Sequence, residues 1–230
     1  MKRLGLLGGM SWESTALYYR EINEGIAARL GGLHSADLVL ASVDFATIER
    51  LQVAGDWDAA AAILAARAHD LELAGAELLV LCTNTMHRVA PQIEAAIGIP
   101  LLHIADPTGE ALIAGGHRRV GLLGTRFTME QSFYRDRLVQ QFGLDVLVPA
   151  ELDRETVHRI IYDELVLGIV RDESRERYRD VIDRLIAAGA DSVILGCTEI
   201  TMLIGPADSA VPVFDTTALH AQAAVTRALA

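Results

Sequence analysis

Short apolar runs of strand length alternate along the chain with longer amphipathic segments of helix length. This alternation is typical of parallel sheets whose strands are connected by helices. We therefore predict an α/β fold in which helices fill most of the intervals between the strands. The predicted strands are Leu4 to Leu7, Leu38 to Val43, Leu78 to Leu81, Leu101 to Ile104, Val120 to Leu123, Val146 to Val148, Ser192 to Leu195 and Val213 to Phe214.

An internal repeat relates the two halves of the chain. The segment KRLGLLG at 2–8 recurs as RRVGLLG at 118–124, and AGAELLVLCT at 74–83 recurs as AGADSVILGCT at 188–198 with one extra glycine. An apolar strand between glycines is common to all α/β units, so the first match alone is weak evidence. The second match is stronger because it places the only two cysteines of the chain at equivalent points.

We predict from this repeat two similar parallel-sheet α/β domains related by pseudo-two-fold symmetry, with the active site in the cleft between them. One domain comprises 1–105 plus 215–230, so that the last helix completes it, and the other comprises 106–214. Each half closes with a proline-led short strand followed by a helix cap.

Each cysteine follows a buried strand and precedes a predicted helix. Cys82 and Cys197 therefore lie at carboxyl ends of parallel strands, where ligands collect in open α/β sheets. A helix N-terminus favours a carboxylate and can lower the pKa of a thiol. Thr83 and Thr198 add a hydroxyl beside each thiol, and further polar residues follow in the same turns: Asn84, Thr85 and Glu199.

A pair of thiols suits the inversion of an α-carbon, since one group removes a proton from one face and the other delivers a proton to the opposite face. Two other interpretations remain open for Cys82 and Cys197. Both side chains can be small buried apolar groups at strand ends, or they can form a redox disulfide between the halves.

Composition narrows the classes of cofactor and partner. Of the 20 basic residues only Lys2 is a lysine, and its place before the first strand is a poor one for a pyridoxal-phosphate Schiff base, so we expect no cofactor. The net charge of −11 and the scattered basic residues argue against nucleic acid as a partner. No apolar stretch is long enough to cross a bilayer and no signal-peptide core is present, so we expect a cytoplasmic protein. The seven histidines show no zinc-ligand spacing, and we expect no metal.

Several motifs together strongly resemble the aspartate/glutamate racemase family over the whole chain, most closely its bacterial branch of broad-specificity amino-acid racemases. These motifs are GGMSWES at 8–14, GGLHSA at 31–36, SVDF at 42–45, CTNTMH at 82–87, GTRFTMEQ at 124–131, GCTE at 196–199 and FDTTALH at 214–220. The resemblance implies an isomerase that racemises amino acids without pyridoxal phosphate, acting commonly as a homodimer on a small-molecule amino acid.

Carried over by position, the resemblance makes Cys82 and Cys197 the catalytic pair. It assigns the substrate carboxylate largely to backbone N–H groups and short hydroxyls of Met10, Ser11, Asn84, Thr85 and Thr198, and Thr83 is a further candidate substrate contact. Arg50 and Gln52 lie where the family places substrate contacts after the second strand.

One departure limits the prediction of the substrate. Aspartate-specific members typically carry a basic residue in the segment that corresponds to 160–168, and this chain has none there. Glu164 in that segment would repel an acidic side chain and attract a basic or polar one, although a glutamate on a helix is more often solvated surface. His87, five residues after Cys82, could tune the thiol, but we interpret it as a helix-surface histidine.

Alternatives to racemisation of aspartate, glutamate or a broader set of amino acids stay open. One is a related cysteine-based enzyme, such as a hydantoin racemase, a maleate isomerase or a decarboxylase acting on a malonate. The other is a non-catalytic protein that binds amino acids, for which no thiol is needed.

Overall fold

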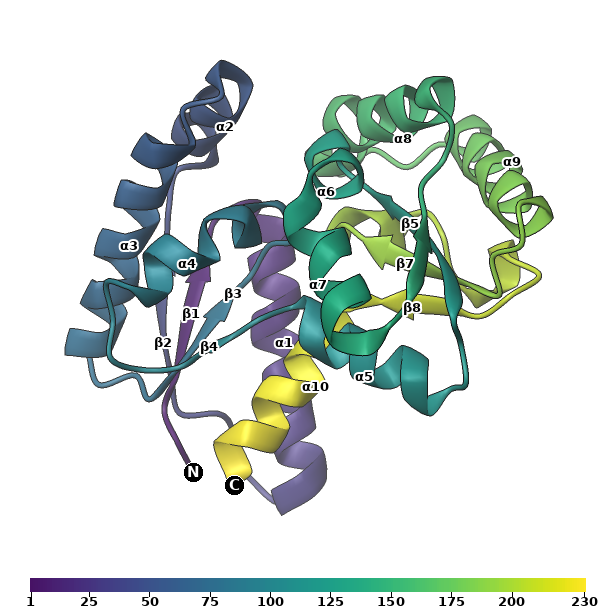
Figure 1. The fold of residues 1–230 in the computed structure, drawn as a ribbon. Coiled ribbons are helices and arrows are strands. Elements are labelled where there is room, and N and C mark those ends of the chain that lie inside the picture. The colour runs from purple at the N-terminus through teal and green to yellow at the C-terminus, as the bar shows by residue number, and fades with distance from the viewer. The chain divides into compact units, whose positions relative to one another are not determined.

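The computed structural model describes residues 1–230, which form two compact units. Unit 1 comprises Met1–Ile104 and His220–Ala230, and unit 2 comprises Ala105–Leu219. Each unit contains one four-stranded sheet in which every pair of neighbouring strands is parallel (Figure 1). The predicted fold class, two parallel-sheet α/β domains, is confirmed.

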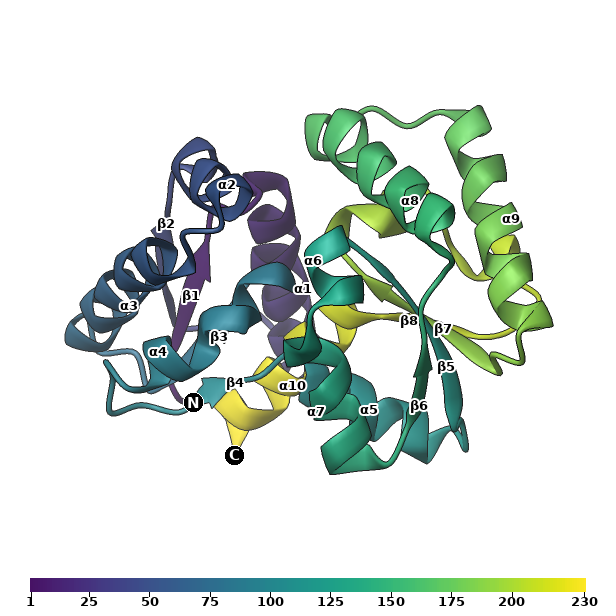
Figure 2. The same ribbon diagram turned by 45° about the horizontal axis from the view of Figure 1, so that its top comes forward.

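The sheet of unit 1 has the strand order β2-β1-β3-β4. Its strands and helices are β1 (Leu4–Gly8), α1 (Trp12–Leu30), β2 (Leu38–Ser42), α2 (Phe45–Ala54), α3 (Trp57–Leu73), β3 (Leu78–Leu81), the 3₁₀ helix η1 (Thr85–Val89), α4 (Ala90–Glu94), β4 (Leu101–Leu102) and most of α10 (Thr216–Leu229). Both faces of the sheet are covered (Figures 1 and 2).

Side chains of the two central strands of unit 1 alternate between the two faces, as the pleat of a strand requires. Leu79 and Leu81 of β3 pack with residues of α2, α3 and α4. Leu78 and Val80 pack on the other face with α1 and α10, which lie side by side in Figures 1 and 2. Burial on both faces explains why these strands are continuous apolar runs rather than alternating ones.

Unit 2 has the strand order β6-β5-β7-β8. Its elements are α5 (Ala105–Ala114), β5 (Arg119–Gly124), α6 (Arg126–Glu130), α7 (Ser132–Phe142), β6 (Asp145–Leu147), α8 (Glu151–Asp163), η2 (Leu165–Leu167), α9 (Asp172–Ala187), β7 (Ser192–Gly196), η3 (Thr198–Met202), η4 (Pro206–Asp208) and β8 (Val213–Asp215). Val193 and Leu195 of β7 pack into a core formed largely by α8 and α9.

The repeated sequence blocks have repeated structural roles. In unit 1, Glu77 accepts a hydrogen bond from the backbone N–H of Arg3 at 2.9 Å. In unit 2, Asp191 accepts from the N–H groups of Arg118 and Arg119 at 2.8 and 3.0 Å. In both units an acidic residue before the third strand of the sequence therefore fixes the start of the first strand. The strand orders match as well, so Cys82 after β3 and Cys197 after β7 occupy equivalent positions.

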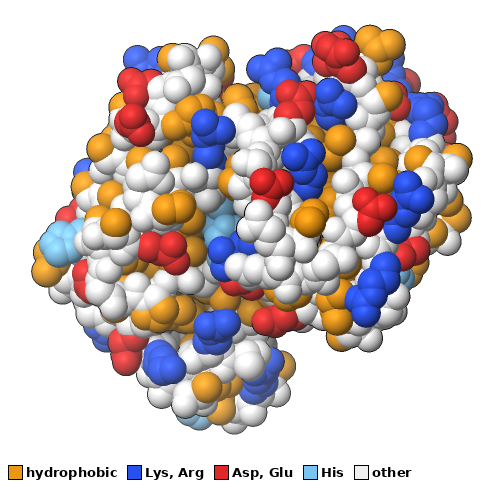
Figure 3. All heavy atoms as spheres, viewed as in Figure 1, with side chains coloured by type: hydrophobic (Ala, Val, Ile, Leu, Met, Phe, Trp, Pro, Cys, Tyr) orange, Lys and Arg blue, Asp and Glu red, His pale blue; other side chains and the backbone are white.

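The charged side chains are interspersed on the surface. On the face shown in Figure 3, Lys and Arg side chains alternate with Asp and Glu side chains, and no broad patch of one sign is present. None of the helices combines the length and the apolar content needed to span a membrane.

Candidate active site

The carboxyl ends of β1 and β3 bring two predicted site segments of unit 1 together. These strands are neighbours in the sheet, and the backbone N–H of Cys82 donates to the carbonyl of Leu7 at 2.9 Å. The loop after β1 holds Met10 and Ser11, and the turn after β3 begins at Cys82. Five predicted substrate-binding residues are buried here, each no more than 7% exposed: Met10, Ser11, Thr83, Asn84 and Thr85.

The loop after β1 is held by a buried threonine hydroxyl. Thr15 accepts from the backbone N–H of Gly9 and donates to the carbonyl of Ser11, both at 2.8 Å. Ser11 in turn caps α1 by accepting from the N–H of Ser14 at 3.2 Å. The backbone of Gly8 runs so close to Thr15 that an added Cβ would lie 2.4 Å from its side chain. The N-terminus of α1, whose N–H groups attract anions, is thus set beside Cys82.

The thiol of Cys82 is in apolar surroundings. It is fully buried in a cluster with Leu6, Val80 and Leu102, and its sulfur lies 3.6 Å from the carbonyl oxygen of Val80. Burial raises the pKa of Cys82 far above that of a free thiol.

The thiol of Cys197 is packed in the apolar core of unit 2 but also contacts a carboxylate. Its sulfur lies 2.9 Å from Oε2 of Glu199, and both residues are buried. Burial and the neighbouring carboxylate raise the pKa of Cys197 well above its usual range, while the backbone N–H groups of Thr198 and Glu199 act in the opposite direction. In unit 2 the thiol is therefore in direct contact with a group able to accept or return its proton.

The two turns are equivalent in sequence position but not in charge. The residue two places after the cysteine is Asn84 in unit 1 and Glu199 in unit 2. Each turn continues into a 3₁₀ helix of five residues, η1 or η3. Burial raises the pKa of both thiols, and at Cys197 it outweighs the backbone N–H groups of Thr198 and Glu199, which act to lower the pKa.

The structure separates the two residues predicted on α2. Gln52 is buried, and its Nε2 lies 3.0 Å from the sulfur of Met86 in η1, next to the Cys82 turn. Arg50 is exposed, and its guanidinium bonds to the carbonyl of Ala46 and the hydroxyl of Thr47 within its own helix.

Glu164 lies at the C-terminus of α8 with its carboxylate turned toward α9. The hydroxyl of Ser174 donates to Oε2 of Glu164 at 2.6 Å, and Arg171 approaches Oε1 at 3.7 Å. The following η2 packs against η3, which begins at Thr198. The segment that carries Glu164 is therefore next to the Cys197 turn, while its carboxylate is held by α9.

The interpretation of His87 as a surface residue is wrong. Its side chain is 1% exposed, with Nδ1 2.7 Å from the carbonyl oxygen of Thr83 and Nε2 3.2 Å from the backbone nitrogen of Ile104. Sequence spacing gave no indication of these contacts because both are made to backbone atoms. The hydrogen bond between Glu199 and Cys197 was also missed, although a carboxylate two residues after a cysteine was a usable signal.

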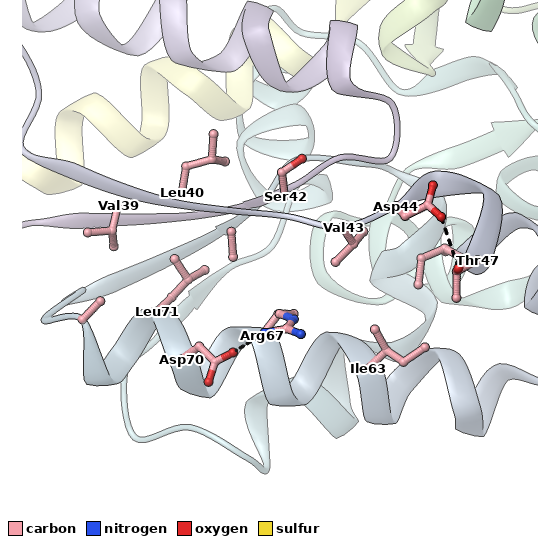
Figure 4. Close-up of a pocket in the computed structure, with 13 residues that line it drawn as sticks. Val39, Leu40, Ser42, Val43, Asp44, Thr47, Ile63, Arg67, Asp70 and Leu71 are labelled. Carbon is pink, nitrogen blue, oxygen red and sulfur yellow. Dashed lines mark hydrogen bonds and ion pairs between the residues drawn. The ribbon is translucent and has the colours of Figure 1, made fainter.

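A hollow of about 660 Å³ lies along β2 and α3, as Figure 4 shows. Its lining includes the ion pair of Arg67 and Asp70 at 2.8 Å, together with apolar side chains such as Leu40 and Leu71. No predicted site residue lines it, so this hollow is a feature of unit 1 apart from the Cys82 turn. No three His, Cys, Asp or Glu side chains are grouped so that they could hold a metal ion.

Two parallel α/β sheets, each presenting a Cys-Thr turn at the carboxyl edge, define a class of duplicated α/β proteins with a thiol in each half. Residues 7–224 match the model of the Asp/Glu/hydantoin racemase family, and the chain belongs to that family.

Individual relatives agree with the family assignment. A crystal structure of a candidate Asp/Glu racemase from Yersinia pestis is 58% identical with a TM-score of 0.94, and that of an aspartate racemase homologue from Pyrococcus horikoshii OT3 is 33% identical with a TM-score of 0.84. Both alignments cover 100% of each chain. The broad-specificity amino-acid racemase RacX of Bacillus subtilis is 24% identical over 163 residues, which are 70% of this chain and 68% of RacX.

Proposed function

We propose that this protein is a cofactor-independent amino-acid racemase, an isomerase that interconverts L- and D-enantiomers through Cys82 and Cys197. The observation that carries the proposal is the equivalence of the two Cys-Thr turns, each at the carboxyl end of a central strand in its own sheet. Membership of a family described by Asp/Glu/hydantoin racemisation supports the reaction class. The substrate is aspartate, glutamate or a member of a broader set of amino acids, as the relatives' names suggest.

The reaction balances as two proton transfers. One cysteine, as thiolate, takes the α-proton and becomes a thiol, which leaves a carbanion at the α-carbon. The other cysteine, as thiol, gives its proton to the opposite face and becomes a thiolate. The enantiomer has then been inverted with no net change of protons, and the roles of Cys82 and Cys197 exchange for the reverse direction.

The differing surroundings of the thiols suit these roles. The buried thiol of Cys82 favours its neutral form, because burial penalises the charged thiolate and raises its pKa. Glu199, at 2.9 Å from Cys197, is placed to take the proton of that thiol and return it. The ionisation of Cys197 is thus linked to the carboxylate of Glu199. We propose that the ionisation of Cys82 depends instead on groups of the bound substrate.

The substrate carboxylate is proposed to bind the backbone N–H groups and hydroxyls of the two cysteine turns and of the loop after β1. The residues concerned are Met10, Ser11, Thr83, Asn84, Thr85 and Thr198. Gln52, whose Nε2 contacts Met86 of η1, is proposed as a further contact. Arg50 and Glu164 are proposed to contact the substrate side chain. For this, Arg50 would give up its bond to Ala46, and Glu164 its bond to Ser174.

The position of the single lysine supports a mechanism without pyridoxal phosphate. Lys2 precedes β1, and its backbone N–H bonds to the carbonyl of Ala228. It therefore lies at the amino end of the sheet of unit 1, whereas Cys82 lies at the carboxyl end. A Schiff base formed at Lys2 would be a full strand length away from the thiol.

The proposal is tested by incubating single enantiomers in deuterium oxide without added cofactor and following optical inversion and α-deuteration. The substrate panel spans acidic, polar and basic amino acids and hydantoins. Cys82→Ser and Cys197→Ser are each expected to abolish inversion, while Lys2→Arg, the matched control for a lysine-dependent mechanism, retains it. If no compound in the panel gains α-deuterium, racemisation is wrong.

The same experiment decides between the alternatives. Unchanged turnover in both cysteine variants would refute the two-thiol mechanism. Binding of amino acids without any exchange would favour a non-catalytic binding protein. Turnover of a maleate or malonate without racemisation would place the protein with the related isomerases or decarboxylases.

We further propose a homodimer. Trp12 and Tyr19 lie two turns apart on one face of α1 and are 68% and 53% exposed, and Leu33 and Leu40 are exposed in the same unit. Exposed aromatic side chains are typical of protein–protein contacts. Light scattering after size exclusion is expected to give twice the chain mass of 24.8 kDa, with Trp12→Ser shifting the species toward monomer. A monomer at every concentration tested would contradict this assignment.

A further inference from the structure

A cluster of buried rings, which we call the histidine cluster, lies inside unit 1. It consists of Tyr18, His87, His103 and His220, and none of these side chains is more than 7% exposed. The ring of His87 lies 4.5 Å from that of His103 and 5.9 Å from that of His220, measured between centroids. Three imidazoles this close in the interior require defined hydrogen-bond partners, because an unpaired buried polar group is costly.

The partners of His87 determine which of its nitrogens carries the proton. Nε2 faces the backbone N–H of Ile104 at 3.2 Å, and because an amide N–H only donates, Nε2 is the acceptor. Nδ1 lies 2.7 Å from the carbonyl oxygen of Thr83, which only accepts, so Nδ1 carries the hydrogen. His87 is therefore a neutral ring in the Nδ1–H form.

His220 is held in the opposite form. Its Nε2 lies 2.8 Å from the carbonyl oxygen of Leu102, so Nε2 carries the hydrogen, and its Nδ1 accepts from the hydroxyl of Tyr18 at 2.8 Å. Both nitrogens of His87 and both nitrogens of His220 are thus committed to hydrogen bonds. The rings of His87 and His220 are consequently held by structural hydrogen bonds and are not available as metal ligands.

The positions of these ties along the chain are informative. The chain passes from unit 1 to unit 2 after Ile104 and returns to unit 1 at His220. His87 bonds to Ile104, the last residue before the first crossing, and to Thr83, the residue next to Cys82. One ring thereby joins the Cys82 turn to the point where the chain leaves the unit.

We propose that His87 is a positioning residue that sets the geometry of the Cys82 turn through its bond to Thr83 and anchors this turn to the crossing at Ile104. The proposal rests on the proposed function in so far as it predicts an effect on racemisation. His87 is itself not a proton donor to substrate, because both of its nitrogens are occupied by backbone groups.

Two conservative variants separate the two bonds. In His87→Asn the amide nitrogen replaces Nδ1 and can still donate to Thr83, but the bond from the Ile104 N–H to Nε2 is lost. In His87→Gln the amide oxygen replaces Nε2 and can still accept from Ile104, but the bond to Thr83 is lost. His69→Gln on α3 is the matched control, since its side chain is 54% exposed.

The tie is measured without any turnover. Nitrogen-15 spectra are expected to show the Nδ1–H form for His87 and the Nε2–H form for His220. Alkylation of Cys82, located by mass spectrometry, is expected to be about fivefold faster or more in His87→Gln than in the wild type, since the turn opens more often. His87→Asn instead accelerates hydrogen exchange at the Ile104 amide and leaves alkylation of Cys82 close to the wild-type rate.

Racemisation is expected to follow the bond to Thr83. The kcat of His87→Gln falls about 10- to 100-fold with KM changed far less, and His87→Asn recovers most of the loss. An Nε2–H form at His87, or equal alkylation rates in all variants, overturns the positioning role. If the expected protonated forms of His87 and His220 and the expected alkylation rates are found but the wild-type protein racemises no amino acid, the proposed function is refuted. The link that His87 makes between Thr83 and Ile104 is then still supported.

Discussion

Replacement of Thr15 by valine tests how the loop after β1 is held. Valine has nearly the same shape as threonine but no hydroxyl, so Thr15→Val removes the two 2.8 Å bonds to Gly9 and Ser11 without opening a cavity. Thr15 is 4% exposed and Gly9 is buried, so water cannot replace the lost partner of the Gly9 N–H.

The magnitude follows from these two bonds. A buried donor left without a partner costs about 1–3 kcal/mol, and the lost bond to the Ser11 carbonyl adds about 1 kcal/mol. The carbonyl of Ser11 keeps the backbone N–H of Thr15 at 3.3 Å as a second partner. We therefore expect Thr15→Val to lower the free energy of unfolding by about 2–4 kcal/mol, and to raise KM because the loop carries Met10 and Ser11.

The assay is urea denaturation followed by tryptophan fluorescence. Both tryptophans of the chain, Trp12 and Trp57, lie in unit 1, so the signal reports the unit that contains the substitution.

Two controls define the result. Thr226→Val, also in unit 1, removes a similar 2.9 Å hydroxyl bond to a helix carbonyl at an exposed position, and is expected to change stability by about 0.5 kcal/mol or less. Thr15→Ser keeps the hydroxyl. A Thr15→Val protein within about 0.5 kcal/mol of the wild type, or a Thr15→Ser protein as unstable as the valine variant, would refute the reasoning.

Two further predictions concern titrating groups. In a Cys82→Ser background, Glu199→Gln is expected to lower the pKa of Cys197, because the adjacent negative charge is removed. A pH titration of the thiolate absorbance at 240 nm measures this pKa. A titration midpoint that is unchanged or higher contradicts the prediction. Asp191 has its pKa held below the usual value although partial burial acts to raise it, because two backbone N–H groups bond the carboxylate. Its contribution to stability is present above the unfolded-state pKa and is lost as the pH falls through the lower folded-state pKa. Urea titrations across this acid range are expected to show a shallower pH dependence for Asp191→Asn, and an unchanged slope would rule out the linkage.

The strands could be predicted from the sequence because a strand buried on both faces of its sheet is a continuous apolar run. The strand at 78–81 was predicted with its observed bounds, and each of the other predicted strands overlaps an observed one. The predicted strand Leu101 to Ile104 is wrong in its second half: β4 ends at Leu102. The neighbouring strand β3 ends at Leu81, so no strand residue lies opposite Ile104, whose backbone N–H bonds to His87 instead; no local pattern reports such a bond.

The candidate site was predictable as far as the repeat extended. Equivalent copies of the Cys-Thr block placed both thiols at strand ends, because position in a βα unit follows from order along the chain. The pKa directions of Cys82 and Cys197 were not predictable, since they depend on burial and on the approach of Glu199. The partners of Glu164 were also hidden, because Ser174 of α9 and Arg171 just before that helix supply them.

The return of the chain to unit 1 at His220 has a consequence for the order in which the protein is assembled during synthesis. Unit 2 is one continuous segment, whereas Ala221, Ala224 and Val225 pack in the same apolar cluster as Leu4 and Cys82. A nascent chain can complete unit 2 while that face of the first sheet still lacks its cover, a state open to chaperone binding and aggregation. The apolar cluster that holds Cys82 is therefore complete only after residues 220–230 have left the ribosome and packed on the first sheet.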